Sequence, residues 1–455
     1  MGYRDGVHAP VGVERDPTPL RVAGTLPEAL RGTFARNAPD DQFPPLGKSH
    51  WFDGDGMVHA VHFGDEGPVY RCRRTRTAAL QAEAEAGHAL WGGILHPVAP
   101  PGGPPLKDTA NTHLVAHRGR LITTWWLSGR PLELDPVTLD TLGPPPFASA
   151  LKRTVAAHPK VDPRTGELLF FGYQLHKPPF YWVGIASAEG ELVRVEDVDV
   201  AGPRIPHDIG FTDRFVVLLD LPMGWDPAAM RAGKLRIGFD KEAPARIGLW
   251  PRSGGAVRWF DVPACYVYHL SSSYEDGETV VVTGCRIDDP IPAERREGVP
   301  HLDIIELAPV TTRWTLDLAS GTARVETLDD HPTEFPRVND ATWGRQARFG
   351  YHPRVARTPE LQFEGFDKLD YGGGRKVTRA YPDGWRGGEV VFAPRPGGTA
   401  EDDGWVLTML THPDEAASEL WVLDAQQVDA EPVARVTLPW RVPLGFHAEW
   451  APATS

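Results

Sequence analysis

Short runs of alternating apolar and polar residues recur along the chain, and each run is followed by a turn and a second run. Examples are LELDPVTLDTLG, GIASAEGELVRVEDV and WTLDLASGTARVETL. Alternation with a period of two is typical of half-buried β-strands, and Gly, Ser and Asp at the turns supply the backbone conformations that hairpins need. The pattern therefore predicts an all-β protein that is built from hairpins.

The hairpin units recur along the chain. Their turns lie at Asp135, Ser187, Arg252, Asp317 and Asp424. Successive turns are 52, 65, 65 and 107 residues apart, so the last gap has room for a degenerate unit near residue 370, and VHFGDEGPVYRC near Asp65 resembles a seventh copy. A strand-built repeat of this kind is typical of β-propellers, and the alternative is a sandwich with irregular hairpins. We predict a seven-bladed β-propeller that forms a single domain over residues 1–455.

Two segments have helical character and interrupt the strand pattern. Thr77–Leu90 is rich in Ala and Glu, and Asp226–Leu235 is a second, shorter candidate. We expect both to be insertions on one face of the propeller.

Composition narrows the classes of function and the compartment. The net charge is −14 without a basic tract, which argues against a nucleic-acid partner. The chain has three cysteines, too few for a disulfide framework, and no apolar stretch approaches the roughly 18 residues that span a bilayer. The N-terminal residues lack the apolar core of a secretory signal. We expect a cytoplasmic protein without an obligate protein partner, with peripheral membrane contact left open.

Four of the 17 histidines occupy nearly the same point in four repeat units. His158, His207, His269 and His447 follow the turn of their unit by 23, 20, 17 and 23 residues. This point is the start of the next unit, where a propeller places its innermost strand. Since innermost strands converge on the central axis, four imidazoles from four directions are expected to form a metal site there without any local motif.

Two glutamates stand at the corresponding point of two other units. Glu334 and Glu389 are natural partners for the Nδ1–H groups of ligating imidazoles, which fixes the tautomer and strengthens donation to the metal. The remaining histidines fall outside this phase and are expected to be ordinary core or surface residues. They are His8, His50, His59, His62, His88, His96, His113, His117, His176, His301, His331, His352 and His412.

Several longer motifs are spread over nearly the whole chain. They are HWFDGDGMVHAVHF, DTANTHLVAHRGRL, PHDIGFTDRFVVLLDLP, YVYHLSSSYEDG, TEFPRVN, EVVFAPRPG and LGFHAEW. Together they resemble the carotenoid cleavage oxygenase family, which includes apocarotenoid and lignostilbene dioxygenases. The resemblance implies a dome of loops and short helices over one axial Fe(II) per chain. The ligands would be His158, His207, His269 and His447, with Glu334 and Glu389 behind them and Thr112 near an open coordination position.

The chain departs from the family pattern at a third glutamate. The family has this residue before a Gly-x-Pro in the strand near residue 126, where the chain reads TTWWLSGRPLELD. Trp126 or Leu127 stands there, so one ligand, which we expect to be His158, lacks its usual carboxylate. Stilbene-cleaving relatives also hold a substrate phenol with a tyrosine and a lysine, and this neighbourhood has no lysine. We therefore expect a retuned iron site and a substrate that is recognised without a phenol.

The resemblance implies oxidative scission of a C=C bond of a carotenoid or apocarotenoid, with O2 as co-substrate and carbonyl products. One alternative is an aryl alkene, such as a stilbene or phenylpropene, cleaved by the same chemistry. Another is a metal-dependent propeller hydrolase or lactonase, and a third is a binding propeller with a relict site. The apolar substrate must reach the axis through an apolar passage. We expect this passage to be lined by Trp91, Trp125, Trp126, Phe171 and Tyr173.

Overall fold

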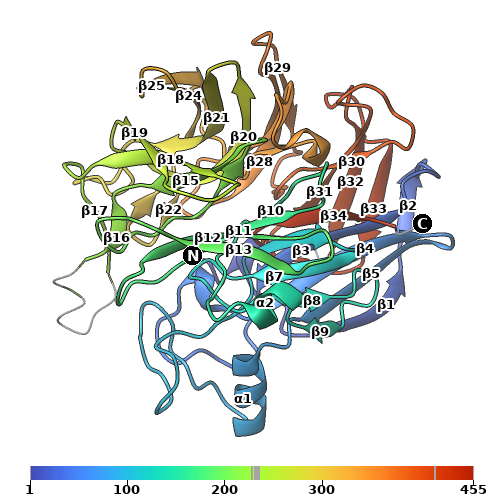
Figure 1. Cartoon of the computed structure of the whole chain (residues 1–455). Coiled ribbons are helices and arrows are strands. Elements are labelled where there is room, and N and C mark those ends of the chain that lie inside the picture. Colours follow the sequence, from blue (N-terminus) through green and yellow to red (C-terminus); the bar gives the residue numbers. More distant parts are fainter. Residues whose placement is uncertain (1, 227–228, 230–235, 415–416, 454–455) are drawn as a thin grey trace.

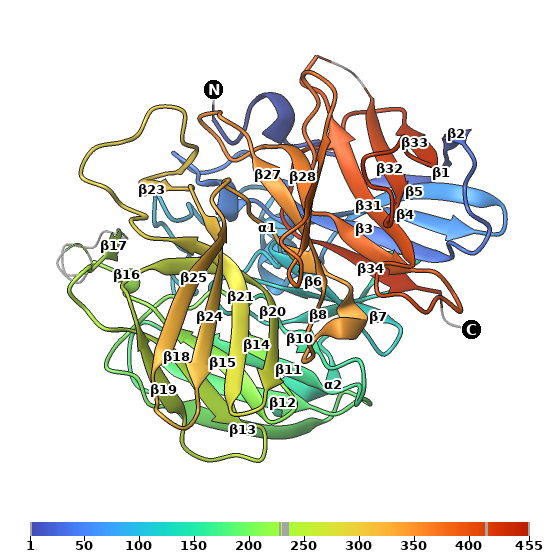
Figure 2. The ribbon, with the colours of Figure 1, turned by 90° about the horizontal axis from the view of Figure 1, so that it is seen from above.

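The computed structural model describes residues 2–226, 229, 236–414 and 417–453. Within these residues, seven antiparallel sheets of four or five strands stand around a common axis (Figure 1, Figure 2). The predicted seven-bladed β-propeller is therefore confirmed.

Five blades are built from four strands each, which follow one another from the axis outward. One contains β6 (His113–His117), β7 (Arg120–Thr124), β8 (Leu132–Leu134) and β9 (Thr141–Gly143). The next contains β10 (Lys160–Val161), β11 (Leu168–Tyr173), β12 (Tyr181–Ala186) and β13 (Leu192–Val198). The third contains β14 (Gly210–Phe211), β15 (Phe215–Asp220), β18 (Ala245–Pro251) and β19 (Arg258–Val262). The fourth contains β20 (Tyr266–Asp276), β21 (Thr279–Ile287), β24 (Val310–Asp317) and β25 (Ala323–Asp329). The fifth contains β26 (Arg337–Val338), β27 (Phe349–Val355), β28 (Phe363–Asp370) and β29 (Lys376–Ala380).

The remaining two blades close the ring because each combines strands from both ends of the chain. One contains β30 (Val391–Pro394), β31 (Gly404–Thr411), β32 (Ser418–Asp424), β33 (Ala434–Leu438) and β2 (Arg21–Gly24). The other contains β34 (Ala448–Pro452), β3 (Gly32–Pro39), β4 (Gly56–Gly64), β5 (Gly67–Arg74) and β1 (Arg15–Pro19). The C-terminal strand β34 is thus paired with β3, and the N-terminal strand β2 is paired with β33.

Shorter elements lie outside the blades. They are η1 (Gly6–His8), η2 (Trp51–Asp53), α1 (Ala78–Ala86), α2 (Pro146–Ala150), β16 (Met223–Trp225), β17 (Ile237–Phe239), β22 (His301–Leu302), β23 (Ile305–Glu306) and η3 (Asp340–Thr342). The segment with η2 and α1, the β16–β17 hairpin and the β22–β23 hairpin together form a dome. Residues of η2, of both hairpins and of the stretch after α1 line one cavity beneath it.

The helix predicted at Thr77–Leu90 is confirmed as α1, although it is shorter. The Thr77 side chain accepts a hydrogen bond from the Leu80 N–H at its start, and Gly87 ends it with a φ of 74°. Most of the second predicted helix, Asp226–Leu235, lies outside the described residues. None of the described helices is long and apolar enough to cross a membrane.

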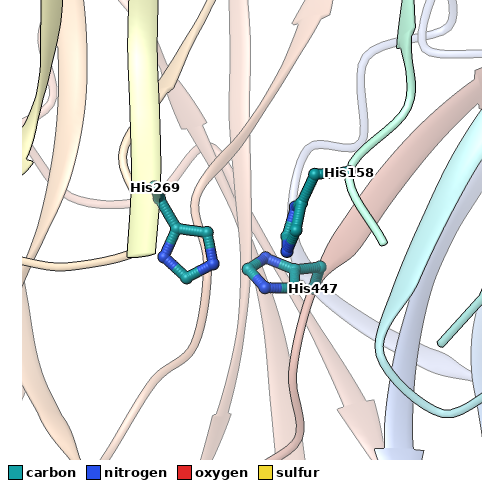
Figure 3. Close-up of side chains that lie close together, drawn as sticks. All are labelled: His158, His269 and His447. Atoms are coloured by element: carbon teal, nitrogen blue, oxygen red, sulfur yellow. The ribbon is translucent and has the colours of Figure 1, made fainter. Parts of the chain in front are cut away.

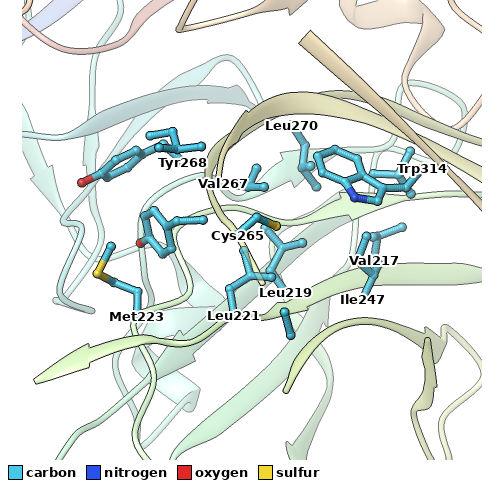
Figure 4. Close-up of a cluster of buried hydrophobic side chains, with 14 of the residues drawn as sticks. Val217, Leu219, Leu221, Met223, Ile247, Cys265, Val267, Tyr268, Leu270 and Trp314 are labelled. Carbon is cyan, nitrogen blue, oxygen red and sulfur yellow. The ribbon is translucent and has the colours of Figure 1, made fainter. Parts of the chain in front are cut away.

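Apolar side chains fill the spaces between neighbouring blades. One cluster joins the β14–β15–β18–β19 blade to the β20–β21–β24–β25 blade (Figure 4). In it, Val217 and Leu219 of β15 and Leu270 of β20 pack with Trp314 of β24, and each of these side chains is nearly or wholly inaccessible to solvent. Burial of apolar surface on this scale is the main stabilising contribution, and it fixes the blades that carry the axial residues.

Candidate metal centre

Each innermost strand has a polar side chain at or near its first residue. In blade order these residues are Thr112, His158, His207, His269, Glu334, Glu389 and His447. All seven are buried. The position that these residues share in the sequence repeats therefore lies beside the propeller axis in every blade. The pattern of histidines predicts this placement.

The four histidine rings form one cluster. The His158 ring centroid lies 4.9 Å from that of His207, 4.8 Å from that of His269 and 4.4 Å from that of His447. Figure 3 shows the rings of His158, His269 and His447 gathered around one point, and one ring nitrogen from each lies within 4.8 Å of the other two. The His207 ring packs beside them, 5.1 Å from His269, but its nitrogens are not part of this tighter set.

The unpaired ring nitrogens fit a metal ion. Nε2 of His158 and Nε2 of His269 are fully buried and have no hydrogen-bond partner among the described residues. Buried polar atoms almost always have a partner, and neutral imidazole nitrogens are common metal ligands. A cation held between these rings would satisfy both atoms.

Two buried carboxylates orient two of the rings. Nδ1 of His269 lies 2.5 Å from Oε2 of Glu334, and Nδ1 of His447 lies 3.1 Å from Oε1 of Glu389. The other oxygen of Glu389 accepts the backbone N–H of Ala448. With Nδ1–H donated to a carboxylate, Nε2 of each ring is free to donate its lone pair toward the axis.

Burial controls the charges in the cluster. It lowers the pKa values of His158, His207 and His269 well below the usual value for histidine, and the neighbouring imidazoles lower them further. Burial raises the pKa of Glu334 to about 8. Burial acts in the same direction on Glu389, but its interactions with His447 and Arg337 and the hydrogen bond from the Ala448 N–H outweigh burial and lower its pKa. The imidazoles of His158, His207 and His269 are therefore neutral at physiological pH, which is the form that binds a metal.

Two of the four candidate ligands lack a carboxylate partner, whereas the sequence predicts only one. His158 is the ligand expected to lack a carboxylate, and no described carboxylate bonds to its ring. His207 lacks one as well, because its Nδ1 is fully buried without any hydrogen-bond partner among the described residues. The departure from the family pattern therefore also affects His207, and Trp126 lines the same cavity as His207.

The backbone of His158 has an unusual conformation. Its φ of 64° is left-handed, which is strained for a residue with a side chain and is often found at functional sites.

The Thr112 side chain lies near the axis and is fully engaged. Its hydroxyl donates to Oδ1 of Asn111 and accepts the backbone N–H of Trp126. Because this hydroxyl is already bonded, Thr112 is placed to shape the site and not to exchange a proton with a substrate.

A fifth histidine lies at the cluster, and its placement corrects the expectation that His113 is an ordinary residue. The His113 ring centroid is 4.6 Å from that of His158 and 5.4 Å from that of His447. Its Nδ1 is buried without a partner in the described part of the chain. His113 is the first residue of β6, the one innermost strand whose phase is hidden in the sequence by the dome insertion that precedes it.

Cavities lie on both sides of the cluster. A large cavity of about 610 Å³ under the dome is lined by His207, Trp126 and Tyr268, and a small one of about 30 Å³ is lined by Thr112 and His269. On the other side, a cavity of about 270 Å³ is lined by His113, His158, His269 and His447 together with charged residues such as Lys160 and Arg337. The histidine cluster thus lies between two cavities, and the one that contains Lys160 and Arg337 carries more charged side chains close to the rings.

The aromatic residues that the sequence predicts along the passage are divided among different places. Trp126 lines the large cavity, whereas Trp125 and Tyr173 line a separate side cavity of about 560 Å³. Trp91 lines another cavity of about 30 Å³. Phe171 is packed in the core and is absent from the linings of these cavities. Phe52 and Tyr268, which the sequence did not single out, also line the large cavity, together with Met223 and Trp225.

A buried axial cluster of histidines, backed by glutamates at the hub of a seven-bladed propeller, defines a class of propeller proteins with a candidate metal site on the axis. Residues 8–452 match the family model described as retinal pigment epithelial membrane protein (RPE65), and the chain belongs to this family. This confirms the resemblance to the carotenoid cleavage oxygenases.

Three similar proteins illustrate the range of the family. The chain is 33% identical to a carotenoid cleavage oxygenase of Mycobacterium tuberculosis, with 99% of this chain and 98% of the relative covered. It is similar to the crystal structure of Pseudomonas brassicacearum lignostilbene dioxygenase, with a TM-score of 0.90, 29% identity and coverage of 100% and 99%. It is also similar to cobalt-substituted Synechocystis apocarotenoid oxygenase, with a TM-score of 0.85, 26% identity and coverage of 96% of each chain.

Proposed function

We propose that this protein is a non-haem Fe(II) dioxygenase that cleaves a C=C bond of an apolar alkene with O2 and releases carbonyl products. The observation that carries the proposal is the cluster of buried imidazoles, in which Nε2 of His158 and Nε2 of His269 are unpaired among the described residues, next to a mainly apolar cavity. The ligands would be His158, His207, His269 and His447. When bound, one ferrous ion per chain supplies the centre at which O2 is activated for the scission.

The residues around the centre have distinct tasks in this proposal. Glu334 and Glu389 hold the rings of His269 and His447 in the tautomer that leaves Nε2 free. Thr112 restricts the small cavity between the centre and the large cavity, so that only a small molecule such as O2 fits beside the alkene. Phe52 and the other apolar side chains of the large cavity bind the alkene and exclude water. No side chain is required as a general base.

A carotenoid or apocarotenoid is the substrate class that we propose first, because the cavity under the dome is large and mainly apolar. An aryl alkene is the second candidate. It is favoured by the similarity, over the whole chain, to a structure whose name is lignostilbene dioxygenase, and by the aromatic rings of Phe52 and Trp126, whose centroids are 5.2 Å apart in the large cavity. Both candidates use the same chemistry.

A calcium-dependent hydrolase or lactonase is disfavoured by the donor set. Calcium is bound by oxygen ligands such as carboxylates and carbonyls. Among the described residues, the clustered donor atoms all belong to imidazoles, and the two nearby glutamates are bonded to the outer nitrogens of the rings.

We further propose that residues 1–455 act as one propeller unit in the cytoplasm. The three cysteines, Cys72, Cys265 and Cys285, are buried and free, as expected for a reducing compartment.

The test is a substrate panel of carotenoids, apocarotenals, stilbenes and phenylpropenes with anaerobically purified, iron-loaded protein. Products are analysed by mass spectrometry after reaction with ¹⁸O-labelled dioxygen, and His269→Ala is the matched inactive variant. We expect labelled carbonyl products from at least one alkene with the wild-type protein alone. Absence of carbonyl products and of O2 uptake across the panel would refute the proposal.

A further inference from the structure

Tyr268 occupies the junction between the metal centre and the substrate cavity. It directly precedes His269 in β20, and its ring packs edge-on against the His207 ring, with the centroids 4.9 Å apart and an interplanar angle of 84°. It lines both the large cavity and the small cavity that contains Thr112. A substrate that reaches the centre from the large cavity therefore passes beside this tyrosine.

The Tyr268 hydroxyl has no hydrogen bond to any described residue, although the side chain is only 8% exposed. Nearby tyrosines differ in this respect: Tyr266 donates to the carbonyl of Ile205 at 2.8 Å, and Tyr173 donates to the carbonyl of Trp126 at 2.7 Å. A buried phenol usually finds a partner. The Tyr268 hydroxyl is therefore a donor that the protein itself leaves unused.

The unused hydroxyl is directed away from the apolar core, and Tyr268 is one of the residues that line the large cavity. Figure 4 shows the Tyr268 ring at the edge of the apolar cluster, with its oxygen pointing away from Leu270 and Trp314. The Trp126 indole nitrogen also lacks a partner among the described residues, but that atom is fully covered by protein, whereas the Tyr268 oxygen is not. The cavity that Tyr268 lines combines apolar side chains such as Phe52, Met223 and Leu302 with polar ones such as Asp226, Arg236 and Asp303.

We propose that Tyr268 donates its O–H to an oxygen of the substrate and thereby selects alkenes that carry a hydrogen-bond acceptor close to the bond that is cleaved. This inference rests on the proposed function and narrows its substrate class. It moves the preference from hydrocarbon carotenoids to the aryl-alkene candidate and to apocarotenoids that carry an oxygen near the cleaved bond. Because the Tyr268 ring touches the His207 ring, the acceptor lies within about the span of one aromatic ring from the metal centre. An aryl alkene with a ring oxygen, or a short conjugated carbonyl compound, meets this requirement, and a hydrocarbon polyene does not.

The test compares two probes of nearly equal shape, trans-4-methoxystilbene and trans-4-ethylstilbene. Their dissociation constants are measured by fluorescence titration with iron-loaded protein in the absence of O2. A single neutral hydrogen bond predicts that the wild-type protein binds the methoxy probe about five- to tenfold more tightly than the ethyl probe. Tyr268→Phe is expected to bind both probes with equal affinity, while its iron content stays that of the wild type.

Tyr266→Phe is the matched control, because the Tyr266 hydroxyl is already donated to a backbone carbonyl. It should keep the preference for the methoxy probe even where its stability falls. The inference is overturned if Tyr268→Phe keeps the preference, if the wild-type protein shows none, or if neither probe binds. The two proposals can also fail separately. If Tyr268→Phe abolishes the wild-type preference but no carbonyl products form when O2 is added, the role of Tyr268 in binding is supported. Only the proposed dioxygenase activity is then contradicted.

Discussion

Nδ1 of His269 lies 2.5 Å from Oε2 of Glu334, and both side chains are buried at the propeller axis. The two residues come from neighbouring blades, since His269 belongs to β20 and Glu334 precedes β26. The same carboxylate oxygen also accepts the backbone N–H of Phe335, which fixes its position. The orientation of a candidate metal ligand therefore depends on a contact between two blades.

Above about pH 8, where Glu334 is ionised, Glu334→Gln is expected to lower iron affinity by roughly 10- to 100-fold, because an amide accepts the His269 Nδ1–H more weakly than a carboxylate does. The measurement is iron retained during titration with a chelator. Glu326→Gln is the matched control, since Glu326 is an exposed residue of β25 that pairs only with Arg324 among the described residues. Equal iron retention by both variants would contradict the role assigned to Glu334.

The four candidate ligands are not expected to contribute equally. His269 is oriented by Glu334, whereas Nδ1 of His207 has no described partner. His269→Ala should therefore reduce iron affinity more than His207→Ala does, by roughly tenfold. Both affinities are measured by the same chelator titration, with circular dichroism as a check of folding. A larger loss in His207→Ala would show that His207 is the more strongly held ligand.

The dome depends on a buried ion-pair triad. Nζ of Lys107 lies 2.5 Å from Oδ1 of Asp55 and 2.6 Å from Oε2 of Glu83, and Glu83 belongs to α1. Lys107→Met leaves two buried carboxylates without their cation, so we expect a loss of about 3–5 kcal/mol in the free energy of unfolding. Urea denaturation measures this loss.

Lys241→Met is the control for Lys107→Met, because Lys241 forms an exposed ion pair with Asp289 at a similar distance. We expect a change of less than about 1 kcal/mol for this surface pair. Similar stabilities of the two variants would show that the triad does not hold the dome.

The sequence predicts those parts of the site that follow the repeat, and it misses those that depend on the dome. The phase of the hairpins is enough to bring His158, His207, His269 and His447 to one point, because every blade meets the axis at the same place in its unit. His113 escapes detection because a long insertion separates β5 from β6 and hides the phase of that unit.

The cavity lining is harder to predict for a related reason. Trp125 and Trp126 are neighbours in the sequence, but they line different cavities. Tyr268 belongs to the blade strand β20 and Met223 to the β16–β17 hairpin of the dome, yet both line the large cavity. No local sequence pattern links the two residues. Which aromatic side chains face the substrate is decided by contacts between distant segments, whereas the propeller itself is encoded by local alternation and turns.

The central claim is that the clustered imidazoles hold one iron ion. The most direct test is elemental analysis by inductively coupled plasma mass spectrometry of protein purified without oxygen. We expect about one iron per chain in the wild type and nearly none in His447→Ala with an intact fold. Stoichiometric calcium or zinc without iron, or full iron content in His447→Ala, would contradict it.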